Sequence, residues 1–283
     1  MKISLFLFIF SFLTYSQTIQ IDKYLSKWLK NQDAVLLFNY ENGKILYEYH
    51  SYMYDEKFSI GSIFKIITTF AYIENKGNEN KIYICNDSDN MFCWKKNGHG
   101  KVNLQKAFIK SCNRFFYSLD ITPDKLYKTA KYLGINLPDI SLNKLTVKEK
   151  KLIKAGNIHF IKANFYELSK LLTAIAGKGK GIDIRNKKKI YIKEIHIINK
   201  IRTLMDLTVK KGTASVVKHK KNFFGKTGTA KNKFGKLIGS FIGFTKNKKY
   251  AIIVRLNGNI GAAASKIADE VIFLYKKFNK GMK

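Results

Sequence analysis

The chain has 283 residues, 46% of them hydrophobic, which allows a sizeable core and excludes a disordered or collagen-like chain. Its formal net charge is +32, and the excess is nearly all Lys, spread along the chain rather than clustered. Because nucleic-acid readers generally rely on Arg for bidentate contacts, we predict no nucleic-acid partner, although attraction to an anionic cell envelope follows from the charge.

The start of the chain is typical of an export signal. Lys2 supplies a positive charge, residues 3–13 form an almost unbroken apolar run, and small residues before Gln17 offer a cleavage site. The run is shorter than the roughly 20 apolar residues of a transmembrane helix, although an uncleaved anchor is the alternative. We therefore predict a signal peptide over residues 1–16 and one domain over residues 17–283, located in the periplasm or on the outer face of the cytoplasmic membrane.

The first predicted elements are two strands and a helix. Residues 34–40 and 44–50 are β-rich runs joined by a turn that contains Asn-Gly, which indicates a hairpin. A helical pattern follows over residues 62–76, and Gly77 is expected to end it. The stretch 78–101 is polar and rich in Gly, Asn and Asp, which predicts a loop or short strands.

The rest of the chain is predicted to be helical in the middle and to return to strands near its end. Residues 102–172 show a mostly helical pattern with breaks near Pro123 and Pro138. Three strands with short turns and a closing helix then cover residues 222–230, 237–246, 249–256 and 262–278.

These elements predict an α+β fold. Hairpin connections imply antiparallel pairing. The simplest closure joins strands from both chain ends into one five-stranded antiparallel sheet, flanked by helices, with an all-helical lobe inserted between the two groups of strands.

The cysteine spacing allows a disulfide but does not suggest a metal site. In an oxidising compartment Cys85 and Cys93 are close enough in sequence to form a small disulfide loop, which would leave Cys112 as a free thiol. The sequence contains no CxxC motif, and its five histidines are scattered, so we predict no bound metal.

Ser62 and Lys65 are a candidate nucleophile and base. Their spacing of three residues places the hydroxyl and the amine on one face of a helix. A serine hydroxyl needs a neighbouring base to act as a nucleophile, and a Lys serves when burial lowers its pKa. The motif alone arises often by chance in a chain this rich in Lys, and its Lys is then simply solvated.

A second candidate element is Ser111 with Asn113, in the helical middle of the chain. A hydroxyl and an amide at this spacing can relay a proton and hold a peptide group. The alternative is a helix cap, because Ser and Asn both cap helices well.

A third element is the run Lys226, Thr227, Gly228 and Thr229, at the end of a predicted strand. A cation and hydroxyls on a strand edge suit a substrate carboxylate, and Gly lets a ligand backbone approach closely. The alternative is an ordinary turn.

Together, in this order, the three elements match the signature set of penicillin-binding proteins and class A β-lactamases. From about residue 34 onward the chain resembles the transpeptidase domain of penicillin-binding proteins, particularly those of class B. The stretches that carry the resemblance are 61–65 (GSIFK), 93–100 (CWKKNGHG), 111–117 (SCNRFFY), 212–214 (GTA) and 225–230 (GKTGTA).

The resemblance implies a serine acyl-transferase mechanism. Ser62 would form the acyl-enzyme, Lys65 would take its proton, and Ser111 would pass a proton toward the leaving nitrogen. The backbone N–H groups of Ser62 and Thr229 would form the oxyanion hole.

The resemblance also implies the residues that bind substrate. Asn113 would bind the substrate amide, while Lys226 and Thr227 would hold the terminal carboxylate with help from the Thr229 hydroxyl. Gly228 completes this binding strand. The implied partners are β-lactams and peptidoglycan stem peptides that end in D-Ala-D-Ala, with no metal or cofactor, and the sequence identifies no protein partner.

The implied activity is that of a DD-transpeptidase or a DD-carboxypeptidase. The alternatives are a serine β-lactamase, including one like class D, and a non-catalytic β-lactam sensor. Asn113 favours the transpeptidase, because class D enzymes usually carry Val at that position. Glu149 lies in a Lys-rich polar stretch and is interpreted as a solvated residue rather than the deacylating base of a class A β-lactamase.

Overall fold

The computed structural model describes residues 19–86, 93–221 and 223–280. The predicted signal peptide, residues 1–16, lies outside these ranges. Within them, no helix is long and apolar enough to cross a bilayer.

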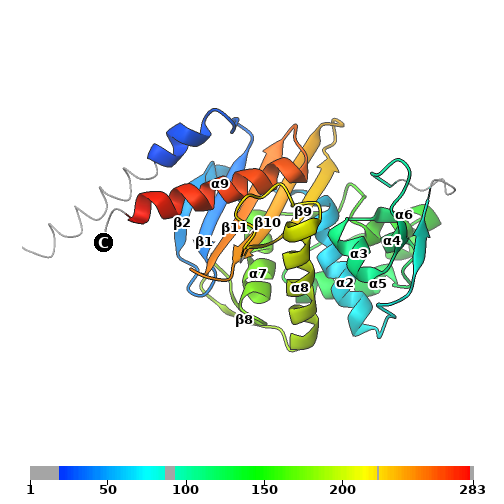
Figure 1. Cartoon of the computed structure of the whole chain (residues 1–283). Coiled ribbons are helices and arrows are strands. Elements are labelled where there is room, and N and C mark those ends of the chain that lie inside the picture. Colours follow the sequence, from blue (N-terminus) through cyan, green and yellow to red (C-terminus); the bar gives the residue numbers. More distant parts are fainter. Residues whose placement is uncertain (1–18, 87–92, 222, 281–283) are drawn as a thin grey trace, which may run out of the picture.

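A five-stranded antiparallel sheet in the order β2-β1-β11-β10-β9 forms the centre of the fold (Figure 1). The start of the chain supplies two strands and its end supplies three, so the predicted α+β sheet built from both chain ends is confirmed. The strands are β1 Ala34–Asn39, β2 Ile45–Tyr49, β9 Phe223–Lys231, β10 Leu237–Thr245 and β11 Tyr250–Asn257.

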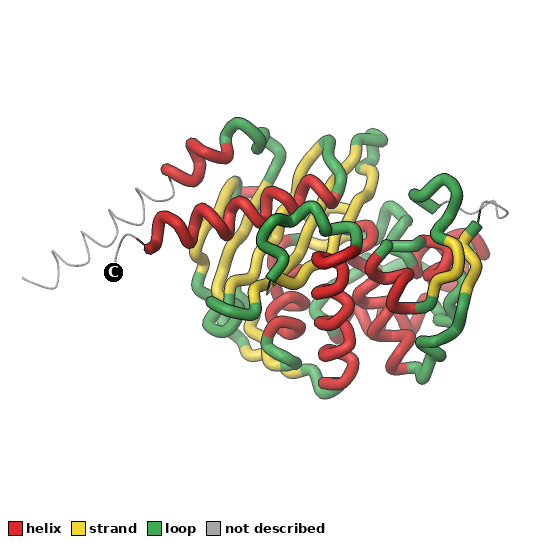
Figure 2. The backbone as a smooth tube through the Cα atoms, viewed as in Figure 1, coloured by secondary structure: helices red, strands yellow, loops and turns green. Residues whose placement is uncertain are grey.

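The sheet has two apolar faces, because apolar side chains along a strand point alternately to one side of the sheet and to the other. On β1, Leu36 and Phe38 enter the larger core, whereas Val35 and Leu37 enter the smaller one, because successive side chains point to opposite faces. The larger core lies under helices from the middle of the chain, and the smaller core lies under the C-terminal helix and a short N-terminal helix (Figures 1 and 2). These covering helices are α7 Phe165–Ala176, α8 Ile195–Lys211, α9 Gly261–Lys280 and residues 19–25.

A helical lobe packs beside β9, at one end of the sheet (Figure 1). It comprises η2 Gly61–Phe64, α2 Lys65–Glu74, α3 Leu104–Ile109, α4 Asn113–Tyr117, α5 Pro123–Tyr132 and α6 Val147–Lys154. It also carries a small hairpin, β4 Tyr83–Cys85 with β5 Gly100–Val102, so the lobe is not purely helical. Short elements elsewhere are η1 Ser51–Met53, β3 Phe58–Ser59, η3 Leu142–Lys144, β6 Lys162–Ala163, β7 Lys180–Ile182 and β8 Lys189–Tyr191.

The helix predicted over residues 62–76 differs from the observed structure at both ends. Its first turn, η2, is a 3-10 turn, and the α-helix begins only at Lys65. At the other end Lys76, not Gly77, takes the left-handed conformation, with a φ of 55°. Gly77 is needed for another reason, because a Cβ there would lie 2.3 Å from the ring of Tyr72.

Two glycines allow β9 to lie directly against η2. A Cβ on Gly61 would come within 2.5 Å of the Thr229 carbonyl oxygen, and a Cβ on Gly228 within 2.4 Å of the Ile60 carbonyl oxygen. Real Cβ atoms do not approach this closely, so both positions require Gly for the two backbones to touch. This contact places the end of β9 at the start of the helix that carries Ser62.

We predict that Gly228→Ala lowers the free energy of unfolding by about 1–3 kcal/mol, the usual effect of overpacking a filled site. The reason is steric, since a Cβ at Gly228 meets the Ile60 carbonyl and the Ser240 hydroxyl, both at 2.4 Å. Urea unfolding measures the change. Gly235→Asn is the matched control, because Gly235 faces open space with a φ of 76° that Asn tolerates. An unchanged midpoint for Gly228→Ala would contradict the close contact.

Candidate active site

The amine of Lys65 is the centre of a buried polar cluster. Its Nζ atom lies 3.0 Å from Ser62 Oγ and 2.6 Å from Asn113 Oδ1. Ser111 supplies two more oxygens, its hydroxyl at 3.0 Å and its carbonyl at 2.9 Å. Lys65 is fully buried, whereas Ser62 is partly open to solvent. A group that reaches the Ser62 hydroxyl therefore finds a base beside it.

The amine of Lys226 approaches the same cluster from β9. Its Nζ atom lies 3.3 Å from Ser111 Oγ and 2.9 Å from the Thr227 carbonyl oxygen. The Ser111 hydroxyl is thus placed between two amines, those of Lys65 and Lys226. The three predicted elements, although far apart in sequence, meet at this hydroxyl.

Burial shifts the pKa of both amines toward the neutral form, and repulsion from Lys65 adds to the shift at Lys226. Burial lowers the pKa of Lys65 to about 7, while the nearby sulfurs of Cys112 and Cys93 oppose this shift. Burial also holds the pKa of Lys226 well below its usual value, and the charge of Lys65 lowers it further. Because of this repulsion, binding of an anion at Lys226 would favour a charged Lys226 and a neutral Lys65.

The backbone at Ser111 is held in an uncommon conformation. Its φ is 53°, in the left-handed region that non-glycine residues rarely adopt. The indole N–H of Trp94 donates to the carbonyl oxygens of Lys110 at 3.0 Å and Ser111 at 3.2 Å. The same Ser111 carbonyl accepts from Lys65. Trp94 thus helps to position the turn, a role that the motif search did not assign, although Trp94 belongs to the stretch 93–100 that carried the resemblance.

Hydroxyl groups line the β9 side of the cluster. Thr227 is buried, and its Oγ1 lies 2.5 Å from Oγ1 of Thr213, a residue of the 212–214 stretch that the site prediction did not include. Thr229 is exposed, and its hydroxyl accepts a hydrogen bond from the Gly261 N–H at 2.9 Å. The Thr229 hydroxyl therefore keeps its own proton for another acceptor. Gly228 lies between the two threonines, against the Ile60 carbonyl.

Glu149 lies away from this cluster. Its carboxylate accepts hydrogen bonds from the backbone and side chain of Thr146 and so completes a capping box at the start of α6. These bonds lower the pKa of Glu149. The Glu149 carboxylate therefore caps a helix at the surface, in agreement with the interpretation of Glu149 as a solvated residue.

The structure corrects two expectations about the cysteines. Cys85 and Cys93 are free thiols rather than a disulfide, and Cys112 lies beside them. His99 is not isolated, because its ring joins the three thiols, with all four donor atoms within 4.8 Å of one another. Spacing along the chain did not reveal this cluster, since the pairing of Cys85 with Gly100 across the β4–β5 hairpin brings His99 to the thiols.

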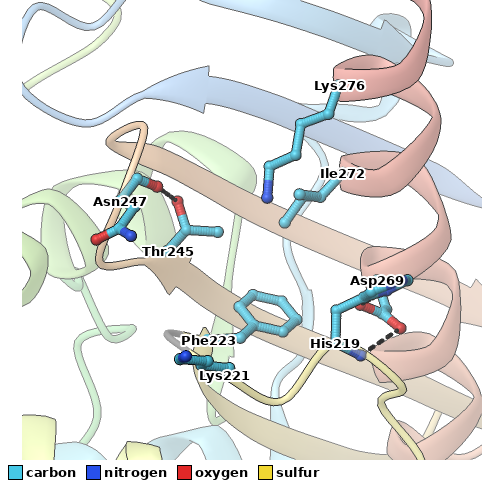
Figure 3. Close-up of a pocket in the computed structure, with 8 residues that line it drawn as sticks. All are labelled: His219, Lys221, Phe223, Thr245, Asn247, Asp269, Ile272 and Lys276. Carbon is cyan, nitrogen blue, oxygen red and sulfur yellow. Dashed lines mark hydrogen bonds and ion pairs between the residues drawn. The ribbon is translucent and has the colours of Figure 1, made fainter.

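A separate cavity of about 130 Å³ lies between α9 and the ends of β9 and β10 (Figure 3). The side chains of His219 and Asp269 lie in its wall, 3.0 Å apart, and Asp269 also accepts from the backbone N–H of Lys218. These bonds fix the loop that leads into β9 onto α9. None of the predicted site residues lines this cavity.

Comparisons with known proteins agree with the geometry. A family model described as the penicillin binding protein transpeptidase domain matches residues 28–275. Among solved structures, the transpeptidase domain of Burkholderia pseudomallei penicillin-binding protein 3 is 14% identical, with 94% of this chain and 93% of that chain covered and a TM-score of 0.74. Penicillin-binding protein 2 of Helicobacter pylori, solved with MreC, is 20% identical, with 94% and 63% covered and a TM-score of 0.76.

Penicillin-binding protein A of Mycobacterium tuberculosis is 19% identical, with 86% of this chain and 76% of that chain covered and a TM-score of 0.68. At these identities the structures establish a shared fold. A comparison with curated proteins found no match.

We predict that Trp94→Phe lowers the free energy of unfolding by about 1 kcal/mol, because it removes the indole donor and keeps an aromatic ring. The other tryptophan, Trp28, is the matched control, since its indole N–H has no hydrogen-bond partner among the described residues. Urea unfolding of Trp94→Phe and Trp28→Phe measures the difference. Equal midpoints for the two variants would show that the Trp94 hydrogen bonds do not support the turn.

Proposed function

The chain belongs to the penicillin-binding protein transpeptidase family, and from this premise we propose that it is a serine acyl-transferase with Ser62 as its nucleophile. Its substrates are peptidoglycan stem peptides that end in D-Ala-D-Ala, and β-lactams acylate the same serine. The observation that carries the proposal is the position of Lys65 Nζ, 3.0 Å from both Ser62 Oγ and Ser111 Oγ.

Acylation begins with proton transfer from Ser62 to neutral Lys65. The hydroxyl oxygen attacks the carbonyl carbon of the penultimate D-Ala, and the carbonyl oxygen becomes an oxyanion. The backbone N–H groups of Ser62 and Thr229 stabilise this charge, and one such donor is worth about 3–4 kcal/mol of barrier. Gly61 and Gly228 support this role, because they allow the two backbones to approach closely enough to share one oxyanion.

The leaving amine takes its proton from the Ser111 hydroxyl. Ser111 Oγ lies within hydrogen-bond distance of Lys65, so the proton removed from Ser62 replaces the one that Ser111 gives up. The C–N bond then breaks, terminal D-Ala leaves, and the peptide remains on Ser62 as an ester. Transfer to an amine completes transpeptidation, whereas transfer to water completes carboxypeptidation.

Separate residues bind the peptide group of the substrate and its terminal carboxylate. Asn113 accepts from Lys65 through Oδ1, which leaves its amide nitrogen to donate to the substrate peptide. The terminal carboxylate binds at Lys226 and the hydroxyls of Thr227 and Thr229. Since β-lactams carry an equivalent carboxylate, they bind the same groups.

Several features favour slow deacylation over β-lactamase activity. Glu149, the carboxylate considered for a class A mechanism, caps α6. Asn113, rather than Val, occupies the third position of the second element, two residues after Ser111. We therefore expect the acyl-enzyme formed with a β-lactam to persist. We further propose that the protein acts outside the cytoplasm, where peptidoglycan is assembled, and that its net charge of +32 favours association with the anionic envelope.

We predict that benzylpenicillin forms one long-lived covalent adduct on Ser62. Mass spectrometry of the intact protein and of its peptides measures the adduct, its position and its lifetime. Ser62→Ala abolishes labelling, whereas Ser51→Ala, a change at an exposed serine, leaves it intact. Continuous turnover of nitrocefin instead of a burst that stops would establish a β-lactamase, and a stable adduct without activity on D-Ala-D-Ala peptides would establish a sensor.

The second-order rate of acylation by benzylpenicillin should rise with pH and level off above about pH 7. Proton transfer from Ser62 requires neutral Lys65, whose pKa burial lowers to about 7. Below that pH the neutral fraction, and hence the rate, falls about tenfold per pH unit. A rate that stays flat between about pH 5 and 7 would exclude Lys65 as the base.

A further inference from the structure

Three thiols and one imidazole gather in the helical lobe, next to the candidate catalytic residues. The Sγ atoms of Cys85, Cys93 and Cys112 and a ring nitrogen of His99 all lie within 4.8 Å of one another. All four side chains are buried. A buried group of soft sulfur and nitrogen donors without acidic side chains is the donor set of a structural zinc site.

The distances suit a tetrahedral ion. The Nδ1 atom of His99 lies 3.4 Å from Cys93 Sγ and 3.7 Å from Cys85 Sγ. With Zn–S bonds of about 2.3 Å and Zn–N bonds of about 2.0–2.1 Å, tetrahedral geometry requires S···N separations of about 3.6 Å and S···S separations of about 3.8 Å. The side chains therefore need only small movements to bind one ion.

The imidazole of His99 has no better partner. Its Nδ1 faces the thiols, and its Nε2 is buried without a hydrogen-bond partner among the described residues. Thiols are weak hydrogen-bond partners for a buried ring. A cation bound to Nδ1 accounts for an orientation that protein hydrogen bonds alone do not explain.

The local backbone is built to bring the donors together. Gly98 has a φ of 69°, and a Cβ there would lie 2.1 Å from the Cys85 carbonyl oxygen. Only a glycine therefore lets the backbone pass this close to the end of β4. The hairpin register then pairs Cys85 with Gly100 and sets His99 beside it. Cys85 thus comes from β4, Cys93 and His99 come from the connection between β4 and β5, and Cys112 comes from the turn before α4.

We propose that Cys85, Cys93, His99 and Cys112 bind one Zn²⁺ ion, which positions the turn from Ser111 to Asn113. Four protein ligands fill all four positions, so no water or substrate binds the ion and its role is structural. The metal site does not depend on the proposed acyl transfer.

The link to the active site is covalent and short. Cys112 lies between Ser111 and Asn113, and both of these residues contact Lys65. Cys93 directly precedes Trp94, whose indole donates to the Ser111 carbonyl. Zinc therefore fixes both the turn and the residue that supports it. This explains how Ser111 keeps a left-handed conformation.

Metal analysis of the untagged, purified full chain tests the site. We expect about one zinc per chain, and Co²⁺ exchanged into the site should give thiolate-to-cobalt charge-transfer absorption with the intense visible bands of a tetrahedral ion. A chain that binds neither metal after incubation, or that gives weak octahedral cobalt bands, would overturn the proposal.

Variants assign the ligands. Cys85→Ser and Cys112→Ser should lose stoichiometric zinc, whereas His196→Gln, a change at an exposed histidine, should retain it. Retention of zinc by both cysteine variants would identify the metal as bound elsewhere and overturn the assignment. Ser62→Ala should keep its zinc while losing penicillin labelling, so failure of the acyl-transfer proposal and failure of the metal proposal are distinguishable.

Metal removal tests the positioning role without any substitution. A chelator should lower the Tm of the wild-type chain and slow acylation by benzylpenicillin about 10- to 100-fold, the usual effect of losing support around a site, and added Zn²⁺ should restore both. A restored Tm with an unchanged acylation rate would retain the zinc site but overturn its link to Ser111.

Discussion

The candidate active site depends on direct backbone contact between the start of the first lobe helix and the strand β9. Gly61 and Gly228 permit this contact, because a side chain at either position would collide with the opposing carbonyl. As a result two lysines, one from each element, reach the same serine hydroxyl in a buried setting. Burial lowers the pKa of both amines, and the charge of Lys65 lowers the pKa of Lys226 further.

The sheet could be predicted because its signals are local. Alternating apolar residues and an Asn-Gly turn indicate strands and hairpins directly, and both chain ends carry them. The helix α8 was missed, although its buried residues recur at helical spacing from Ile197 to Val209. The start of α2 was also misplaced, because the close approach of β9 at Gly61, which the sequence does not show, shapes the first turn.

The predicted site residues came from motif order, whereas the missed ones act through tertiary contacts. Ser62 and Lys65 are close in sequence, so their contact follows from helical geometry. Trp94 reaches the Ser111 carbonyl through its indole, and Thr213 meets Thr227 from a loop that comes before β9. The thiol and imidazole cluster depends on the register of a hairpin whose connecting residues 87–92 lie outside the described ranges. Such contacts cannot be recognised from the spacing of residues along the sequence.

The sheet built from both chain ends has a consequence for how the molecule folds. Ala34 on the first strand pairs with Arg255 on the last, so a growing chain cannot complete its sheet until almost all of it has been synthesised. Such distant pairing raises contact order and slows folding. The strand β9 joins β1 only through β10 and β11, so a chain interrupted before β11 would contain Ser62 and Ser111 but could not use this sheet to hold Lys226 beside Ser111.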